Sequence, residues 1–171
     1  MNDERQNLRE KLCRELAQAE RDAVIHTERE CTRLGDVPPA ARMRAISANA
    51  KHLQPRLAKL VSAKQPIGFM LGRAVGDVFS ATRHYFVDRI LSTERSYRAT
   101  LLGLKHGLDA ARLLREVARV DVDVQLAEFC DDLIAQREKL IAAAEHELAW
   151  FATHSAFAMA SGARAAAAAT W

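Results

Sequence analysis

The feature that most constrains this chain is the return of apolar side chains every three or four residues over long stretches. This spacing is the period of one face of an α-helix. Residues 3–34 show it first, at Leu8, Leu12, Leu16, Ala19, Ala23, Thr27 and Leu34. Gly35 and then Pro38 and Pro39 follow, which is typical of a helix end and the first turn of another helix. We expect one helix over 3–34 and a second to about Lys64, kinked or split at Pro55.

The longest apolar stripe runs from Leu71 to Ala111 and stays in phase across residues 91–95. It predicts a single helix of roughly 50 residues, and two helices that meet near Ser92 are the alternative. The turn that follows offers Asp121 or Asp123 as the N-cap of a last long helix. Residues 155–171 are rich in alanine and either extend that helix or form a disordered tail.

Length and composition agree with a helical protein. The 171 residues fit one domain, and seven glycines with four prolines leave room for few turns. Short connections between long amphipathic helices favour antiparallel neighbours. We therefore predict an all-α fold, an antiparallel up-down bundle of four or five long helices that is ferritin-like in general build. Residues 1–154 are expected to form this domain and residues 155–171 an Ala-rich tail.

Charge and cysteine content point to a cytoplasmic protein. The 25 Lys and Arg residues are interspersed with 22 Asp and Glu residues, so no basic stripe predicts nucleic-acid binding. The charged first residues and the lack of a long uncharged apolar run predict neither a signal peptide nor a membrane span. Three cysteines, Cys13, Cys31 and Cys130, lack paired spacing, which favours a reducing compartment and small core thiols.

Residues 94–114 hold the densest mixture of charged and apolar side chains in the chain. At 100° per residue the charged ones gather on a narrow strip beside the apolar face. Opposite charges stand four residues apart in Glu94–Arg98, Lys105–Asp109 and Arg112–Glu116. This is the layout of a solvated helix flank stabilised by i,i+4 pairs, so we expect no site there.

Gly103 and Gly107 lie four residues apart beside the same apolar face. Each glycine costs a helix about 1 kcal/mol relative to alanine. Two in succession predict that another helix approaches closely at this point. A hinge is the alternative explanation.

Three charged residues fall inside apolar stripes: Glu20, Glu30 and Arg137. A buried charge without a partner is costly, so such groups usually pair. We hypothesise that Arg137 meets Glu20 or Glu30 and that the pair fixes helix register. The alternative is that Arg137 extends its stem to reach water.

Metal chemistry has little support in the sequence. Ferritin-like di-iron sites need Glu-x-x-His on two helices, and none of the six histidines has a glutamate three residues before it. A weaker candidate is a degenerate set on one helix, Glu20, Asp22, His26 and Glu30, with help from Glu147. Glycine-loop, nucleophile-elbow and C-x-x-C motifs are also missing from the sequence, so no cofactor or catalytic residue is predicted.

These patterns predict a non-catalytic protein that acts through protein–protein interaction or self-association. Long helices with incompletely covered apolar area, especially the far half of the expected helix of roughly 50 residues, favour a homodimer. A metal-binding bundle with the degenerate Glu/Asp/His set is the alternative function. A small-molecule sensor with a pocket inside the bundle is a third, and it would leave no trace in the sequence.

Overall fold

A computed structural model describes residues 2–62 and 91–161 of the chain. The long helices are α1 (Asn2–Leu34), α2 (Pro38–Ser62), α4 (Thr93–Val120) and α5 (Val124–His146). Two short helices follow, α6 (Leu148–Thr153) and α7 (Ser155–Met159). Over these residues the elements are helices and no strand is formed, so the all-α prediction is confirmed there. The expectations for residues 63–90 and for 162–171 lie outside the described residues.

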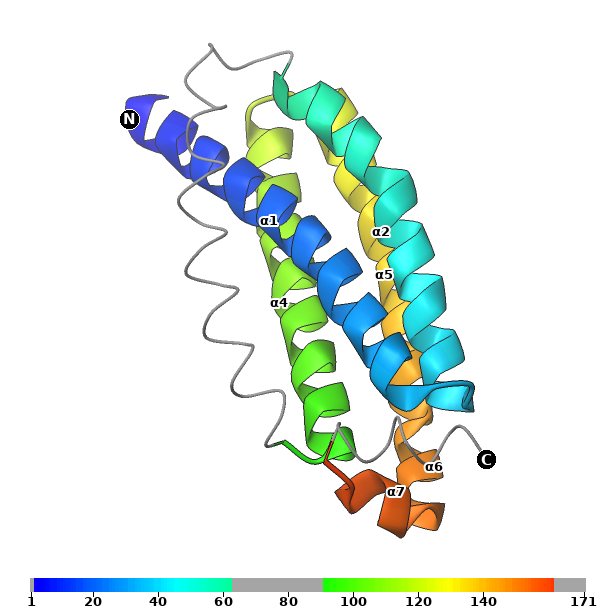
Figure 1. Ribbon diagram of the computed structural model, residues 1–171. Coiled ribbons are helices and arrows are strands. Elements are labelled where there is room, and N and C mark those ends of the chain that lie inside the picture. The colour runs from blue at the N-terminus through cyan, green and yellow to red at the C-terminus, as the bar shows by residue number, and fades with distance from the viewer. Residues whose placement is uncertain (1, 63–90, 162–171) are drawn as a thin grey trace.

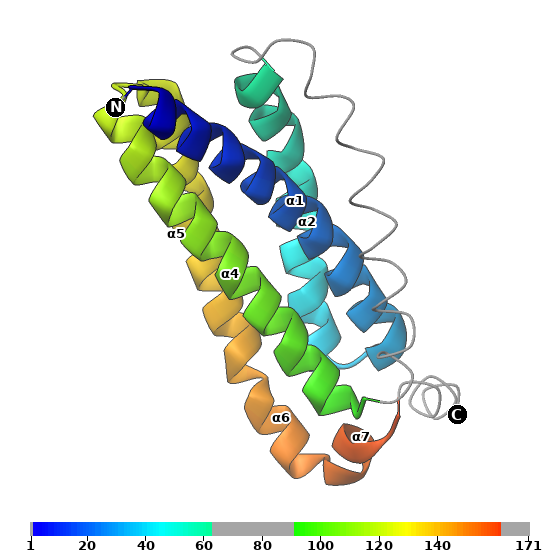
Figure 2. The same ribbon diagram turned by 90° about the vertical axis from the view of Figure 1, so that its left-hand side faces the viewer.

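The four long helices pack side by side (Figures 1 and 2). Helix α1 packs against α2 and α4, and α5 packs against α4 and α2. The pairs α1–α2 and α4–α5 are antiparallel, whereas α2 and α4 point in the same direction (Figures 1 and 2). Four consecutive alternating helices would require α2 and α4 to be antiparallel, so the four-helix version of the up-down prediction is wrong. A five-helix version depends on residues 63–90, which lie outside the described part.

The first hairpin forms where the turn residues predict it. Helix α1 ends at Leu34, and Gly35 takes a left-handed conformation with φ 72°. The Gly35 N–H donates to the Cys31 carbonyl at 3.0 Å, which closes the helix end. Helix α2 then begins at Pro38 and continues through Pro55 to Ser62, so Pro55 does not split it.

The expected continuity across Ser92 is wrong. Ser92 is extended, with φ −60° and ψ 153°, and α4 begins at Thr93. The Thr93 N–H and Oγ1 both donate to the Ala160 carbonyl, at 3.0 and 2.8 Å. The segment after α7 therefore supplies the partner that the first turn of α4 needs. A domain boundary drawn at His154 would separate α4 from this partner.

The core follows the predicted stripes along the bundle. Its largest fully buried side chains include Leu16, Met43, Tyr97, Phe129 and Leu133. At the end of the bundle where α4 begins, the centroids of the Tyr97 and Phe151 rings lie 5.1 Å apart, and this contact joins α4 to α6. Within residues 2–62 and 91–161, no helix combines the length and the apolar character needed to cross a bilayer.

Candidate functional site

A buried ion pair crosses the middle of the bundle. Arg137 on α5 donates from Nη2 to Glu20 Oε2 on α1 at 2.9 Å, and each residue is only 2% exposed. Arg137 also donates from Nε and Nη2 to Asn49 Oδ1 on α2, at 3.2 and 3.1 Å. Arg137 thus does not extend to water, as the alternative would require. Burial raises the pKa of Glu20 above its usual value, and the charge of Arg137 opposes this rise.

Polar residues of α2 that no sequence pattern singled out complete this network. Besides Asn49, Gln54 donates from Nε2 to the Glu20 carbonyl at 2.9 Å. Asn49 in turn donates from Nδ2 to Gln136 Oε1 at 2.8 Å. These amides connect α1, α2 and α5 around one buried charge pair. Only the requirement that a buried guanidinium satisfy several N–H groups could have suggested them.

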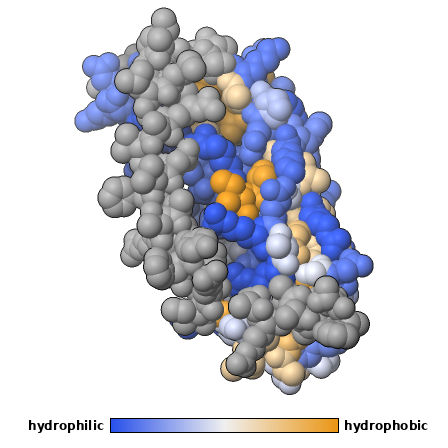
Figure 3. Space-filling view, viewed as in Figure 1, coloured by the Kyte–Doolittle hydropathy of each residue, from blue (hydrophilic) through white to orange (hydrophobic). Residues whose placement is uncertain are grey.

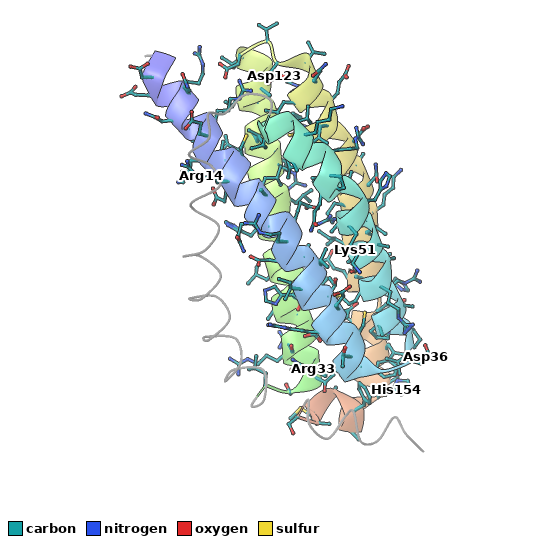
Figure 4. All side chains as sticks on the ribbon, turned by 45° about the horizontal axis from the view of Figure 1, so that its top comes forward. Arg14, Arg33, Asp36, Lys51, Asp123 and His154 are labelled. Atoms are coloured by element: carbon teal, nitrogen blue, oxygen red, sulfur yellow. The ribbon has the colours of Figure 1, made fainter. Side chains whose placement is uncertain are left out.

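Glu30 belongs to a different cluster, between α1 and α4. It accepts a hydrogen bond from Ser96 Oγ, and its Oε1 lies 3.6 Å from Arg33 Nη2. Figure 4 shows Arg33 near the lower end of α1. Next to this cluster the Tyr97 hydroxyl donates to the Ala144 carbonyl at 2.9 Å. Burial raises the pKa of Tyr97 above its usual value, helped by the nearby Glu147 carboxylate, so Tyr97 is a neutral donor that links α4 to α5.

The candidate metal ligands do not come together. Glu20 and Asp22 are two residues apart and so point about 200° apart around α1. Asp22 accepts from Gln18 Nε2 at 2.9 Å on the outer side, while Glu147 pairs with Arg42 Nε of α2 at 2.8 Å. In the part of the chain that the structure describes, no group of three or more His, Cys, Asp or Glu side chains could hold a metal ion. His26 and Glu30 add no such group.

The two glycines of α4 differ in their surroundings. A Cβ built on Gly107 would lie 2.9 Å from Ala19 Cβ, so α1 approaches α4 closely at this point. Among the described residues, a Cβ on Gly103 meets no heavy atom within 4 Å, and Gly103 is exposed. The close approach expected at both positions therefore occurs at Gly107, and the described residues show none at Gly103.

The ion pairs of the charged strip are partly different from those expected. Arg98 Nε does pair with Glu94 Oε2, at 2.7 Å. Lys105 pairs instead with Glu145 of α5. Arg112 lies 2.7 Å from Asp109 and 2.7 Å from Glu138 of α5, instead of pairing with Glu116. The acidic partners Glu145 and Glu138 lie on α5, so the i,i+4 spacing within α4 could not predict these pairs.

The cysteines are not reactive groups. All three are free thiols, with Cys13 and Cys130 buried and Cys31 half-buried. Burial raises the pKa of each, that of Cys130 to about 12. Because the thiolate is the nucleophile, a raised pKa makes these thiols poor nucleophiles at neutral pH.

The outward surface of α4 exposes large apolar side chains. Leu102, Leu113 and Val120 are 70%, 48% and 63% exposed. Leu113 lies 11 residues after Leu102, and Val120 lies 7 residues after Leu113. The three side chains therefore fall within about 20° of one line along the helix. Figure 2 shows α4 flanked by α1 and α5, and the exposure of these three side chains places them on the outer side of α4. We name Leu102, Leu113, Val120 and the charged Arg98, Lys105, Asp109 and Glu116 beside them the α4 outer face.

The surface of the described residues that faces the viewer in Figure 3 is less apolar than the α4 outer face. It is mainly hydrophilic, and its apolar side chains form small patches among charged ones. Helix α2, which carries basic residues and no acidic ones, is neutralised by its neighbours. Lys51 lies 2.5 Å from Glu28 of α1, and Arg56 lies 3.0 Å from Asp132 of α5. Together with the pairs Arg42–Glu147 and Arg44–Asp36, they balance most of the basic charge of α2.

Comparison of this chain with protein-family models, with curated proteins and with solved structures finds no match. Any functional argument therefore starts from the geometry of the chain itself.

Proposed function

We propose that this protein acts through self-association, as a non-catalytic helical bundle whose contact surface is the α4 outer face. The observation that carries the proposal is the line of three exposed large apolar side chains on one helix. Single exposed apolar residues are common on protein surfaces, whereas an aligned apolar set bordered by charges is typical of interaction sites. Fully covering a leucine or valine side chain contributes about 1.5–3 kcal/mol.

The setting proposed for this activity is the cytoplasm. The three cysteines are free thiols, and two of them are buried in the core. Proteins of oxidising compartments commonly pair their cysteines in disulfides, so unpaired cysteines favour a reducing compartment. The ferritin-like build stays a proposal about architecture, supported by two antiparallel pairs in which α2 and α4 point the same way. A metal function is not proposed, since no three of the possible ligands among the described residues come together around one point.

Self-association is tested by sedimentation velocity at protein concentrations up to tens of micromolar. We expect a dimer that dissociates on dilution, and weaker association for Leu102→Glu and Leu113→Glu. Ile25→Glu is the matched control, because Ile25 is 44% exposed but lies on α1. A wild-type protein that stays monomeric at these concentrations would contradict the proposal, as would equal weakening by all three substitutions.

A further inference from the structure

The two leucines and the four charged residues of the α4 outer face follow a similar order when the helix is followed from either end. Leu102 and Leu113 lie at equal distances from a centre between Gly107 and Leu108. On either side of this centre Arg98 matches Glu116, and Lys105 matches Asp109, to within one residue. Leu102 therefore matches Leu113, and each of these two basic residues matches an acidic one, whereas Val120 falls opposite Glu94 and Arg95 at the edge of the pairing.

The matched charges also lie on the same side of the apolar line. Arg98 and Glu116 are 18 residues apart, which is five full turns, so they share one line along α4. Lys105 and Asp109 are four residues apart and differ by about 40°. When two identical helices pair antiparallel about a two-fold axis, the same side of each helix meets itself in inverted order. A parallel pair about a two-fold axis along the helices would instead place the charged side of each helix on opposite edges of the interface, where the two charged sides do not meet.

From this arrangement we propose that two copies of the chain pair antiparallel through their α4 outer faces. The inference rests on the self-association proposed above and names its geometry. Leu102 of one copy packs against Leu113 of the second copy, and the reverse contact forms on the other side of the axis. Arg98 then faces Glu116, and Lys105 faces Asp109, so both basic–acidic contacts form twice.

The ion pairs within one chain leave these groups available. Arg98 and Lys105 have side chains that are 58% and 49% exposed, and the guanidinium of Arg98 has donors beyond the two that contact Glu94. Glu116 contacts Arg115 and Arg119 on the side facing α5, where Arg119 is also held by Asp131 at 3.0 Å. Exposed pairs of this kind contribute little to stability, so sharing a partner across an interface costs little.

The test exchanges charges between two variants, Arg98→Glu and Glu116→Arg. Alone, each variant faces like charges twice across the proposed dimer, so its self-association should weaken by about tenfold or more. In an equimolar mixture the heterodimer regains opposite charges at both contacts and should form in preference to either homodimer. Sedimentation with one variant fluorescently labelled measures both effects. Arg44→Glu is the matched control, because Arg44 is also a half-exposed arginine in an exposed ion pair, with Asp36 on the α2 side.

The outcomes separate this inference from the proposed function. Recovery of association in the mixture, and none with Arg44→Glu, supports the antiparallel pair. A wild-type dimer whose variants associate as tightly as it does, or whose mixture shows no preference for the heterodimer, overturns the α4 pairing and leaves self-association standing. A monomeric wild type overturns both. If either variant has an altered circular dichroism spectrum, Lys105→Glu and Asp109→Lys form the second exchange pair with the same expected recovery.

Discussion

Val122 takes a backbone conformation that β-branched residues rarely adopt. Its φ is 57°, in the left-handed region. The Val122 N–H donates to the Arg119 carbonyl at 3.1 Å, and the Asp123 N–H donates to the Ala118 carbonyl at 2.8 Å. These two bonds form a Schellman motif at the end of α4, with valine at the position that glycine favours. The side chain is 79% exposed, so packing does little to offset the strain.

Replacing Val122 with glycine should therefore stabilise the protein. The left-handed conformation costs an ordinary residue about 1–2 kcal/mol, and the greater freedom of glycine in the unfolded chain returns part of this. We expect Val122→Gly to raise the free energy of unfolding by about 1 kcal/mol in urea denaturation. Val120→Gly, two residues earlier within the helix, is the control and should lower it by about 0.5 kcal/mol. Equal effects of the two substitutions would show that Val122 is not strained.

The Arg137–Glu20 pair should couple α1 to α5 energetically. Removing one partner leaves a buried charge, so Arg137→Met or Glu20→Leu alone should cost about 3–5 kcal/mol. Because the second removal eliminates the stranded charge, the double variant should cost less than the sum of the two, by about 2–3 kcal/mol. A double-mutant cycle of unfolding free energies measures this coupling.

The control for that cycle is an exposed pair. Arg112→Met removes an arginine that contacts Asp109 and Glu138 at the surface, and it should change stability by less than about 0.5 kcal/mol. Purely additive costs for Arg137 and Glu20 would mean that the pair does not hold the two helices in register.

At the scale of the helix, the two glycines of α4 should respond in opposite directions to alanine. Gly107→Ala places a methyl group 2.9 Å from Ala19 Cβ, which forces α1 and α4 apart. We expect a net loss of about 1–2 kcal/mol, with partial recovery when Ala19→Gly is added. Gly103→Ala meets open space among the described residues and should gain up to about 1 kcal/mol from helix propensity. Thermal unfolding of the wild type and the three variants tests this, and a stabilised Gly107→Ala would contradict the close approach.

Features set by neighbouring residues could be predicted from the sequence. Gly35 ends α1, and Asp123 caps α5 by accepting from the Leu126 N–H at 3.3 Å. The apolar period likewise marked Glu20, Glu30 and Arg137 as charges on inward faces, and all three are buried. Each of these features needs no information from beyond its own helix.

Features set by distant residues could not be predicted in this way. The start of α4 at Thr93 depends on Ala160, 67 residues further along the chain. The Arg112–Glu138 pair spans 26 residues, and Asn49 reaches Arg137 across 88. The line of Leu102, Leu113 and Val120 could not be predicted for a different reason, because the apolar period of α4 marks its buried face and these three residues lie outside that face.

At the scale of the whole molecule, the two ends of the bundle are closed by different means. At one end, which Figure 4 marks with Asp123, the start of α1 is tied to the α4–α5 turn by charge. Arg5 lies 2.6 Å from Asp121, and Arg9 lies 2.6 Å from Asp123. At the other end, near His154, α6 and α7 fold back onto α4. There Trp150 packs against the Phe157 ring at 5.2 Å and stacks on His154 at 4.0 Å between centroids.

The closure by α7 should contribute to the stability of the whole bundle, because it supplies the partner for the first turn of α4. Ser92 provides no side-chain cap there. A chain ending at His154 would therefore leave the Thr93 N–H and hydroxyl without the Ala160 carbonyl as acceptor. It would also remove Phe157 and so expose part of the aromatic cluster around Trp150. Compared with a chain ending at Ser161, we expect a loss of roughly 2 kcal/mol in unfolding free energy, from two hydrogen bonds and the uncovered apolar area. Thr93→Val in the longer chain isolates the hydroxyl and should cost about 1 kcal/mol. If both shortened chains unfold at the same urea concentration, α4 begins at Thr93 without help from α7, and the closure is a consequence of the bundle instead of a support for it.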